Sequence, residues 1–236
     1  LLIHGMVEDE KIFTMEDLFR FPKESHFRFL ECAGNGMGEW TSPRGQTVQQ
    51  THGLTSCSQW TGVSLKVLLN ELGVNTDAKW LLAERDDGAR MTRSIPMWKA
   101  LDDAMVVYAQ NGEFLRAEQG FPLRLLVPGF EGNMNVKWLH RLEVSDKPWW
   151  THHEVTEYAD PRPDDKIRAY SFEMEARSVI TSPSAGMKLN GPGFYEISGL
   201  GWSGSGTVTK VEVSTDNGNT WKKANLEAPV LPKCHT

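Results

Sequence analysis

The chain has 236 residues, of which 39% are hydrophobic and 24% are charged, an ordinary balance for a globular protein. Its formal net charge of -6 argues against a nucleic-acid binder, because such proteins normally carry a basic patch or stripe. No apolar run reaches the ~20 residues that a transmembrane helix needs. The length is sufficient for one large domain or two small ones.

Three cysteines, Cys32, Cys57 and Cys234, show neither a CxxC pair nor the spacing of a zinc site. Because the CxxCH motif is absent as well, we expect no haem in this chain. The sequence begins inside a strand-like run at Leu1 and ends equally abruptly at Thr236. We therefore expect a fragment, with any targeting segment outside it.

The first thirty residues predict a strand, a short helix and a second strand. Residues 1–7 form an apolar run typical of a strand. Thr14 is a good N-cap for the helix, with Asp17 at the capping-box position, and Pro22 ends it. The alternating segment 27–30 then predicts a strand.

The following hundred residues predict further short helices and strands. The polar segment 37–51 predicts a loop, and the apolar face of 63–72 predicts a helix that Gly73 ends. Asn111-Gly112 is typical of a hairpin turn. A helical turn is expected over 96–101, and strands over 78–83, 104–110, 123–127 and 136–144.

A change of composition divides the chain into two domains. Residues 148–168 are polar and rich in proline, which predicts a linker after a first domain of residues 1–147. Residues 169–236 read as short strands and turns, with Asn217-Gly218 as a hairpin signal. Such small all-β domains are usually immunoglobulin-like sandwiches of about seven strands, and about five are visible, which favours a truncated one. The predicted fold class is α+β.

Cys32 is the most informative candidate for chemistry. A strand delivers it into a turn that contains Gly34 and Gly36, and glycine lets the backbone approach a ligand closely. A thiolate in such a place suits a soft metal centre. Two alternatives stay open: an ordinary packed cysteine, and a nucleophile with His52 as its base.

Four segments in order resemble the sulfite oxidase family of molybdenum enzymes. Cys32-Ala33-Gly34-Asn35 resembles the segment that binds molybdenum. The other three segments are 56–63, 120–129 and 132–139. Within the family, segments 50–53, 91–96, 131–135 and 193–199 are most similar to the molybdenum subunit of the sulfane dehydrogenase of bacterial thiosulfate oxidation. The resemblance implies a mixed α/β molybdopterin-binding domain followed by an immunoglobulin-like dimerisation domain.

The resemblance also implies roles for single residues. Cys32 is expected to be the molybdenum ligand, and Tyr158 the active-site tyrosine beside it. The residues expected to bind the molybdopterin cofactor are Asn35, Ser56, Cys57, Arg124, Asn135, Val136 and Lys137. From the residues alone, Arg124 can equally be a rim charge, Lys137 a solvated residue and Tyr158 a linker residue without a role.

The chain departs from the family pattern at three positions. Gly36-Met37 and Met134 stand where sulfite oxidases carry arginines, and Gln119 stands where they carry a histidine. Because two positive charges are missing, we expect a bulkier substrate than sulfite, such as a persulfide on a sulfur-carrier protein.

The resulting prediction is molybdenum-dependent oxidation of sulfane sulfur or sulfite. By the resemblance, electrons pass to a c-type cytochrome subunit, the setting is periplasmic, and the C-terminal domain pairs two chains into a homodimer. Two alternatives stay open: a molybdenum sulfoxide reductase of the same fold, and a non-catalytic dimerisation or assembly module.

Overall fold

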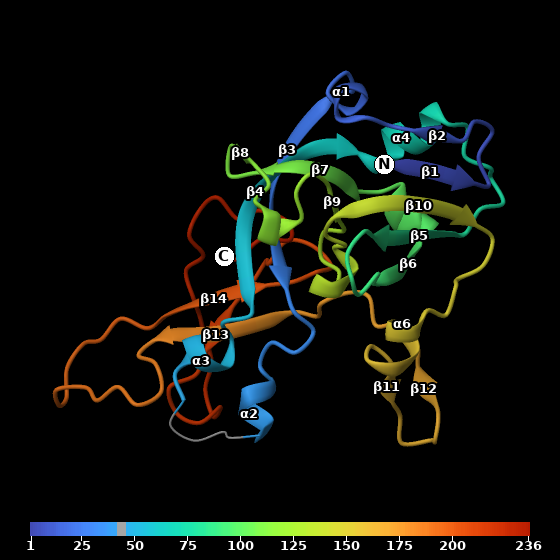
Figure 1. Ribbon diagram of the computed structural model, residues 1–236. Helices are drawn as coiled ribbons and strands as arrows, with labels where there is room; N and C mark the ends of the chain where they lie inside the picture. Colours follow the sequence, from blue (N-terminus) through green and yellow to red (C-terminus); the bar gives the residue numbers. More distant parts are fainter. Residues whose placement is uncertain (42–45) are drawn as a thin grey trace.

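Two five-stranded sheets form the body of the protein in a computed structural model that describes residues 1–41 and 46–236 (Figure 1). The first sheet has the order β2-β1-β10-β5-β6. Its strands are β1 (Leu2–Gly5), β2 (Lys11–Ile12), β5 (Trp80–Arg85), β6 (Thr92–Pro96) and β10 (Leu139–Ser145). β1 and β10 are parallel, and the other neighbours are antiparallel.

The second sheet has the order β3-β4-β7-β8, and β9 also pairs with β7. Its strands are β3 (Lys23–Glu31), β4 (Thr55–Ser64), β7 (Met105–Gln110), β8 (Glu113–Phe114) and β9 (Arg124–Leu126). A continuous apolar core joins the two sheets and includes Ile3 and Leu142 of the first, Val63 and Val106 of the second, and Leu68 of a helix. Burial of this surface is the main stabilising force of the body.

Short helices connect the strands of the body. They are α1 (Met15–Leu18), α2 (Met37–Thr41), α3 (Val48–Thr51), α4 (Leu65–Glu71), α5 (Met97–Ala100) and the 3-10 turns η1 (Ala117–Gln119) and η2 (Gly132–Met134). The predicted capping box is confirmed: Asp17 N donates to Thr14 Oγ1 at 3.1 Å, and Thr14 N donates to Asp17 Oδ2 at 3.0 Å. Gly73 follows α4 with φ +62°, a conformation that glycine adopts without strain.

Two predictions about this part were wrong. Residues 37–51 are not simply a loop, because α2 and α3 lie at its two ends; residues 42–45 lie outside the described part. The predicted helix 63–72 begins late, because β4 continues to Ser64 to complete its pairing with β7. Sheet pairing overrides the local helical pattern at Val63.

The segment predicted as a linker, 148–168, contains regular structure. It includes α6 (His152–Thr156) and a hairpin of β11 (Asp160–Pro161) and β12 (Ile167–Arg168). Thr151 and Glu154 form a capping box at α6. Glu154 is buried and accepts hydrogen bonds from both N and Oγ of Ser94, which fixes α6 against β6.

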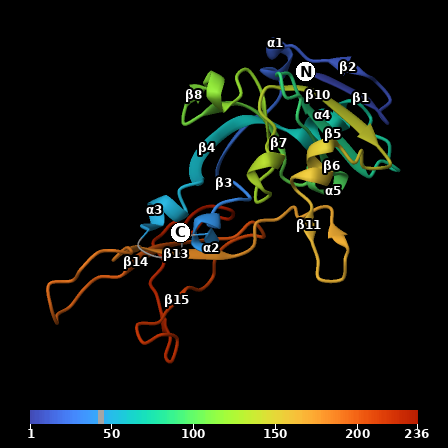
Figure 2. The same cartoon turned by 60° about the horizontal axis from the view of Figure 1, so that its bottom comes forward.

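The C-terminal part consists of two separate antiparallel ladders. β13 (Arg177–Ser182) pairs with β14 (Ser198–Trp202), and β15 (Glu212–Val213) pairs with β16 (Lys222–Lys223) around the predicted Asn217-Gly218 turn. The chain between β13 and β14 extends away from the body in both views (Figures 1 and 2). With mixed helices and sheets throughout, the α+β class is confirmed.

The last residues return to the body and attach the C-terminal part to it. Phe29 N on β3 donates to Lys233 O at 2.9 Å, and Cys234 Sγ donates to Phe27 O at 2.9 Å. Phe29 also packs with Met174 and Trp202 in a small buried cluster. Within the described residues, none of the helices has the length and apolar character to cross a membrane.

Candidate functional site

Cys32 lies where β3 ends, and its thiol is exposed. Its backbone N donates to Leu54 O at 3.0 Å, which is the last contact of the β3–β4 pair. Asn35 N donates to Cys32 O at 2.9 Å and closes a tight turn, in which Gly36 has φ +88°. This left-handed conformation favours glycine, so the sequence builds a turn that presents the sulfur.

Glu31 fixes this turn to the C-terminal part. Its carboxylate is fully buried and accepts from Asn35 Nδ2 at 2.9 Å, Arg177 Nη1 at 3.0 Å and Trp202 Nε1 at 2.6 Å. Asn35 also accepts from Leu54 N at 3.0 Å. The Asn35 side chain therefore braces the cysteine turn, and its predicted contact with a cofactor stays a prediction.

The turn η2 lies directly against the cysteine turn. A Cβ added to Gly132 would be 2.8 Å from Glu31 O and 3.3 Å from Cys32 N, so only glycine allows this approach. Asn135 follows η2 and is buried, accepting from Val127 N at 2.7 Å and donating to Glu131 O at 3.1 Å. Val136 is buried and accepts from Leu125 N. Both residues hold the segment between Gly132 and Lys137 in place.

Tyr158 follows α6 and lies near Cys32, although 126 positions separate them in the sequence. Burial is the main cause that raises the pKa of Tyr158, and the charge of Cys32 is one of the smaller contributions. The guanidinium carbon of Arg93 lies 4.8 Å from the centre of the Tyr158 ring. Tyr158, one of the two residues predicted to be catalytic, is thus in contact with Arg93 and within electrostatic range of Cys32, the other.

Arg93 is a site residue that sequence reasoning did not single out. It lies on β6 and is only 1% exposed, and its Nε donates to Met134 Sδ at 2.9 Å. The signal in the sequence is an arginine inside the otherwise uncharged segment 91–96. Segment 91–96 contributes to the resemblance to the sulfane dehydrogenase branch, but the resemblance does not assign Arg93 a function.

Arg124 and Lys137 form a basic cluster. Arg124 on β9 is buried over the Trp60 ring, and burial lowers its pKa to about 10. Lys137 Nζ donates to Glu118 O at 2.9 Å; burial and then the charges of Arg124 and Arg85 lower the pKa of Lys137. Neither Arg124 nor Lys137 forms a salt bridge with any residue that the structure describes. A buried positive charge without a carboxylate favours an anionic ligand.

Ser56 and Cys57 point to opposite faces of β4. Ser56 shares a face with Ser58 and Trp60, the residue that contacts Arg124. Cys57 lies instead against Cys234, whose thiol hydrogen bond lowers the pKa of Cys57 to about 6. The side chain of Ser56 is thus on the side of the basic cluster, while Cys57 is at the junction with the C-terminal residues.

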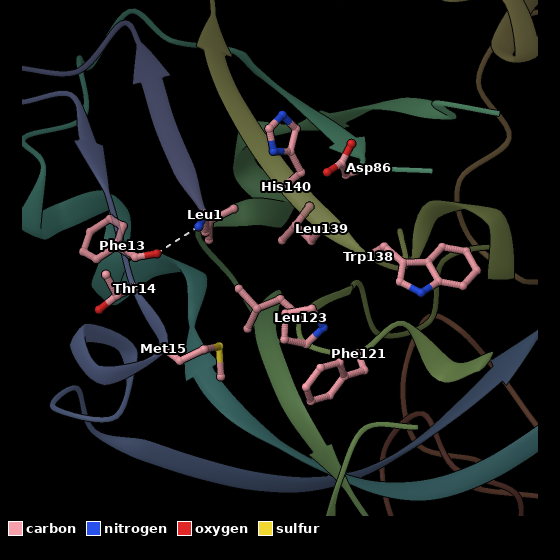
Figure 3. Close-up of a pocket in the computed structure, with 11 residues that line it drawn as sticks. Leu1, Phe13, Thr14, Met15, Asp86, Phe121, Leu123, Trp138, Leu139 and His140 are labelled. Atoms are coloured by element: carbon pink, nitrogen blue, oxygen red, sulfur yellow. Dashed lines mark hydrogen bonds between the residues drawn. The ribbon is translucent and has the colours of Figure 1, made fainter. Parts of the chain in front are cut away.

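One cleft in the body has a volume of about 410 Å³ and lies where β1 and β10 begin and β5 ends (Figure 3). Its wall includes Phe121, Leu123, Trp138 and His140. The Trp138 ring lies 4.6 Å from Lys137 Nζ, so the cleft shares a wall with the basic cluster. Cys32 does not line this cleft.

A smaller cleft of about 230 Å³ lies beside the cysteine turn and is lined by Asn35, Gly36, Glu39, His52 and Arg177, among others. His52 Nδ1 is 2.9 Å from Thr51 Oγ1 and 3.7 Å from Glu39 Oε1. Within the described residues, His52 forms no hydrogen bond with Cys32, so the geometry offers no support for a Cys32–His52 nucleophile.

Cys32 is not part of a protein-only metal site. Among the described residues, no group of three or more His, Cys, Asp or Glu side chains could hold a metal ion. A metal at Cys32 would therefore need its other ligands from a cofactor, and the basic cluster of Arg124 and Lys137 suits a cofactor that carries a phosphate.

Comparisons with known proteins agree with this arrangement. Residues 1–153 match the family model of the oxidoreductase molybdopterin binding domain, and residues 168–235 match that of the Mo-co oxidoreductase dimerisation domain. The chain belongs to the sulfite oxidase family of molybdopterin oxidoreductases.

Relatives in this family have different substrates in their names. The chain is 31% identical to mitochondrial sulfite oxidase of Drosophila melanogaster over 98% of its length and 44% of that protein's. It is 32% identical to the NADH nitrate reductase of Ulva prolifera over 94% of its length and 29% of that protein's. The crystal structure of the sulfane dehydrogenase SoxCD from Paracoccus pantotrophus superimposes with a TM-score of 0.94 at 45% identity, covering all of this chain and 61% of that one. The chain thus spans less than half of these curated relatives.

Proposed function

We propose that this chain carries the molybdenum site of an enzyme that oxidises sulfane sulfur or sulfite. The observation that carries the proposal is the exposed Cys32, presented by a turn that Asn35 and Glu31 brace, with Tyr158 within electrostatic range. Arg124 supports it, since it is buried and forms no salt bridge within the described residues, and a phosphate-bearing pterin would supply the missing negative charge.

The residues around Cys32 and in the basic cluster fit molybdopterin. Cys32 would hold the metal through its sulfur, and Arg124 and Lys137 would hold the phosphate. Ser56 and the backbone of 135–137 face or border the same region, while Asn35 would act by fixing the turn. When bound, the molybdenum cofactor supplies a two-electron oxidant and an oxygen atom for transfer.

The reaction balances with water and an electron acceptor. For sulfite, one water molecule provides the added oxygen, and sulfate, two protons and two electrons are the products. The electrons would go to a c-type cytochrome, and the C-terminal part would pair two chains into a dimer. We propose a periplasmic setting, as the family resemblance of the sequence implies.

The substrate is proposed to be sulfane sulfur, for example on a sulfur-carrier protein, rather than free sulfite. The sequence identity favours this choice, because it is 45% to the sulfane dehydrogenase SoxCD and 31% to a mitochondrial sulfite oxidase. The residues Gly36-Met37, which stand where sulfite oxidases carry an arginine, are a second argument, because one positive charge for a small anion is missing there.

The test compares two substrates with the complete, molybdenum-loaded enzyme and its cytochrome. We expect cytochrome reduction with a persulfide-loaded carrier protein at a much higher kcat/KM than with sulfite. Efficient turnover of sulfite with no reaction of the carrier would contradict the sulfane assignment. Turnover of neither, together with reduction of a sulfoxide, would favour the reductase alternative.

A further inference from the structure

Arg93 contacts both Tyr158 and the η2 turn that packs against Cys32. Its guanidinium is 4.8 Å from the Tyr158 ring centre, and its Nε contacts Met134 Sδ at 2.9 Å. Met134 belongs to η2, whose Gly132 packs directly against the backbone of Cys32. Arg93, Tyr158 and the cysteine turn therefore form one cluster of contacts.

Arg93 is a buried charge without a carboxylate in direct contact. Within the described residues it forms no salt bridge, and its Nη1 atom has no hydrogen bond although it is shielded from solvent. Glu154 and Glu131 attract its charge without contacting it, and they raise its pKa less than burial lowers it. Because a buried unpaired charge is costly, its presence points to a negatively charged ligand nearby.

The position of Arg93 also revises the expectation that two positive charges are missing from the site. Met134 stands where an arginine was expected, yet its sulfur contacts the guanidinium of Arg93. A guanidinium therefore reaches the same region from β6 instead of from η2.

We propose that Arg93 supplies the positive charge that draws the anionic sulfur substrate to the Cys32–Tyr158 site and holds the Tyr158 ring in place. This inference rests on the proposed function. Since Arg93 is 1% exposed, it acts from beneath the surface, through its field and through Tyr158, and is a positioning residue. Its field is strong because little water lies around it to screen the charge.

The test moves the charge between two neighbouring positions. The molybdenum-loaded wild type is compared with Arg93→Met, with the double variant Arg93→Met/Met134→Arg, and with Arg20→Met. Arg20→Met is the control, because it removes the same charge from a side chain that is 79% exposed and does not contact Arg93 or Tyr158. Sulfate, as a stable anionic probe, is titrated calorimetrically, and molybdenum content, kcat and KM are measured in parallel.

We expect Arg93→Met to keep its molybdenum, to bind sulfate about tenfold to a hundredfold more weakly, and to raise KM more than it lowers kcat. The double variant should recover most of the sulfate affinity. Its new arginine side chain at position 134 extends from the place where the Met134 sulfur contacts Arg93 in the wild type, so a guanidinium is restored in the same region. Arg20→Met should match the wild type in every measurement.

Several outcomes would overturn the proposal. These are no measurable sulfate binding by the loaded wild type, unchanged affinity in Arg93→Met, and no recovery in a folded double variant. If Arg93→Met does not fold, the double variant alone decides; if neither folds, Arg93 is structural and the proposal fails. A wild type without molybdenum refutes the proposed function instead, so the two failures are distinguishable.

Discussion

The polar groups around Cys32 fall into two sets that differ in how they are satisfied. Glu31 is fully buried, and its two carboxylate oxygens accept three hydrogen bonds from Asn35, Arg177 and Trp202. Arg93 and Arg124 are also buried, but they form no salt bridge within the described residues, and each has a buried nitrogen without a partner.

This difference distinguishes residues that stabilise the fold from residues that are placed to bind a ligand. A buried polar group whose partners all come from the protein stabilises the fold, and its removal leaves those partners unsatisfied. A buried charge that the protein leaves unpaired destabilises the fold unless a ligand completes it. Mutations in the two sets should therefore have opposite effects on the cofactor-free protein.

The largest effect on stability is expected at Glu31. In Glu31→Ala the Trp202 N–H and the Arg177 guanidinium lose their buried acceptor, so the free energy of unfolding should fall by about 3 kcal/mol. Glu31→Gln should lose less, because the amide oxygen still accepts one donor. Urea unfolding of the cofactor-free protein measures both.

Glu212→Ala is the control for Glu31. Glu212 pairs with Lys210 at 2.9 Å, but both side chains are exposed, so the loss should stay below about 1 kcal/mol. Equal losses at Glu31 and Glu212 would show that the buried carboxylate does not fix the cysteine turn.

Arg124→Met should differ from Glu31→Ala, because it should lower the molybdenum content and not the stability of the cofactor-free protein. In the cofactor-free protein the free energy of unfolding should be unchanged or higher, because an unpaired buried charge is removed. In the protein made with cofactor, molybdenum content should fall about tenfold, because the phosphate loses a charged donor. A loss of more than about 2 kcal/mol without cofactor would instead make Arg124 part of the architecture.

The smallest effect concerns Cys57, at the junction of the two parts of the chain. The Cys234 thiol lowers the pKa of Cys57 to about 6, so alkylation of Cys57 by iodoacetamide should already be fast at pH 7. In Cys234→Ala the midpoint of the labelling rate should move upward by more than one pH unit. Mass spectrometry of the labelled peptide measures it, and identical pH profiles would exclude the contact.

Local signals predicted much of the fold. The Thr14 capping box, Gly73 after α4 and the Asn111-Gly112 and Asn217-Gly218 turns depend on neighbours in the sequence, and the structure has each of them. The end of β4 was misjudged, because the pairing of Val63 with Val106 is a contact between distant residues. Such long-range pairing leaves no mark in a local pattern.

The site was predictable only in part. Glycines around Cys32 identified the turn, and the resemblance added Tyr158, which the structure places nearby. Arg93 was missed because its importance comes from three separate elements, β6, η2 and the segment after α6, meeting in space. The contact of Arg93 with Met134 joins two elements that are distant in the sequence, β6 and η2, which a comparison of single positions does not detect.

The molybdenum content of the complete protein tests the central claim most directly. The wild type, Cys32→Ser and Cys57→Ser would be produced in a host that makes molybdopterin. We predict about one molybdenum atom per chain in the wild type and in Cys57→Ser, and a decrease of about tenfold or more in Cys32→Ser. Equal metal in all three, or none in any, would contradict the account; the second result would leave a non-catalytic dimerisation module as the better explanation.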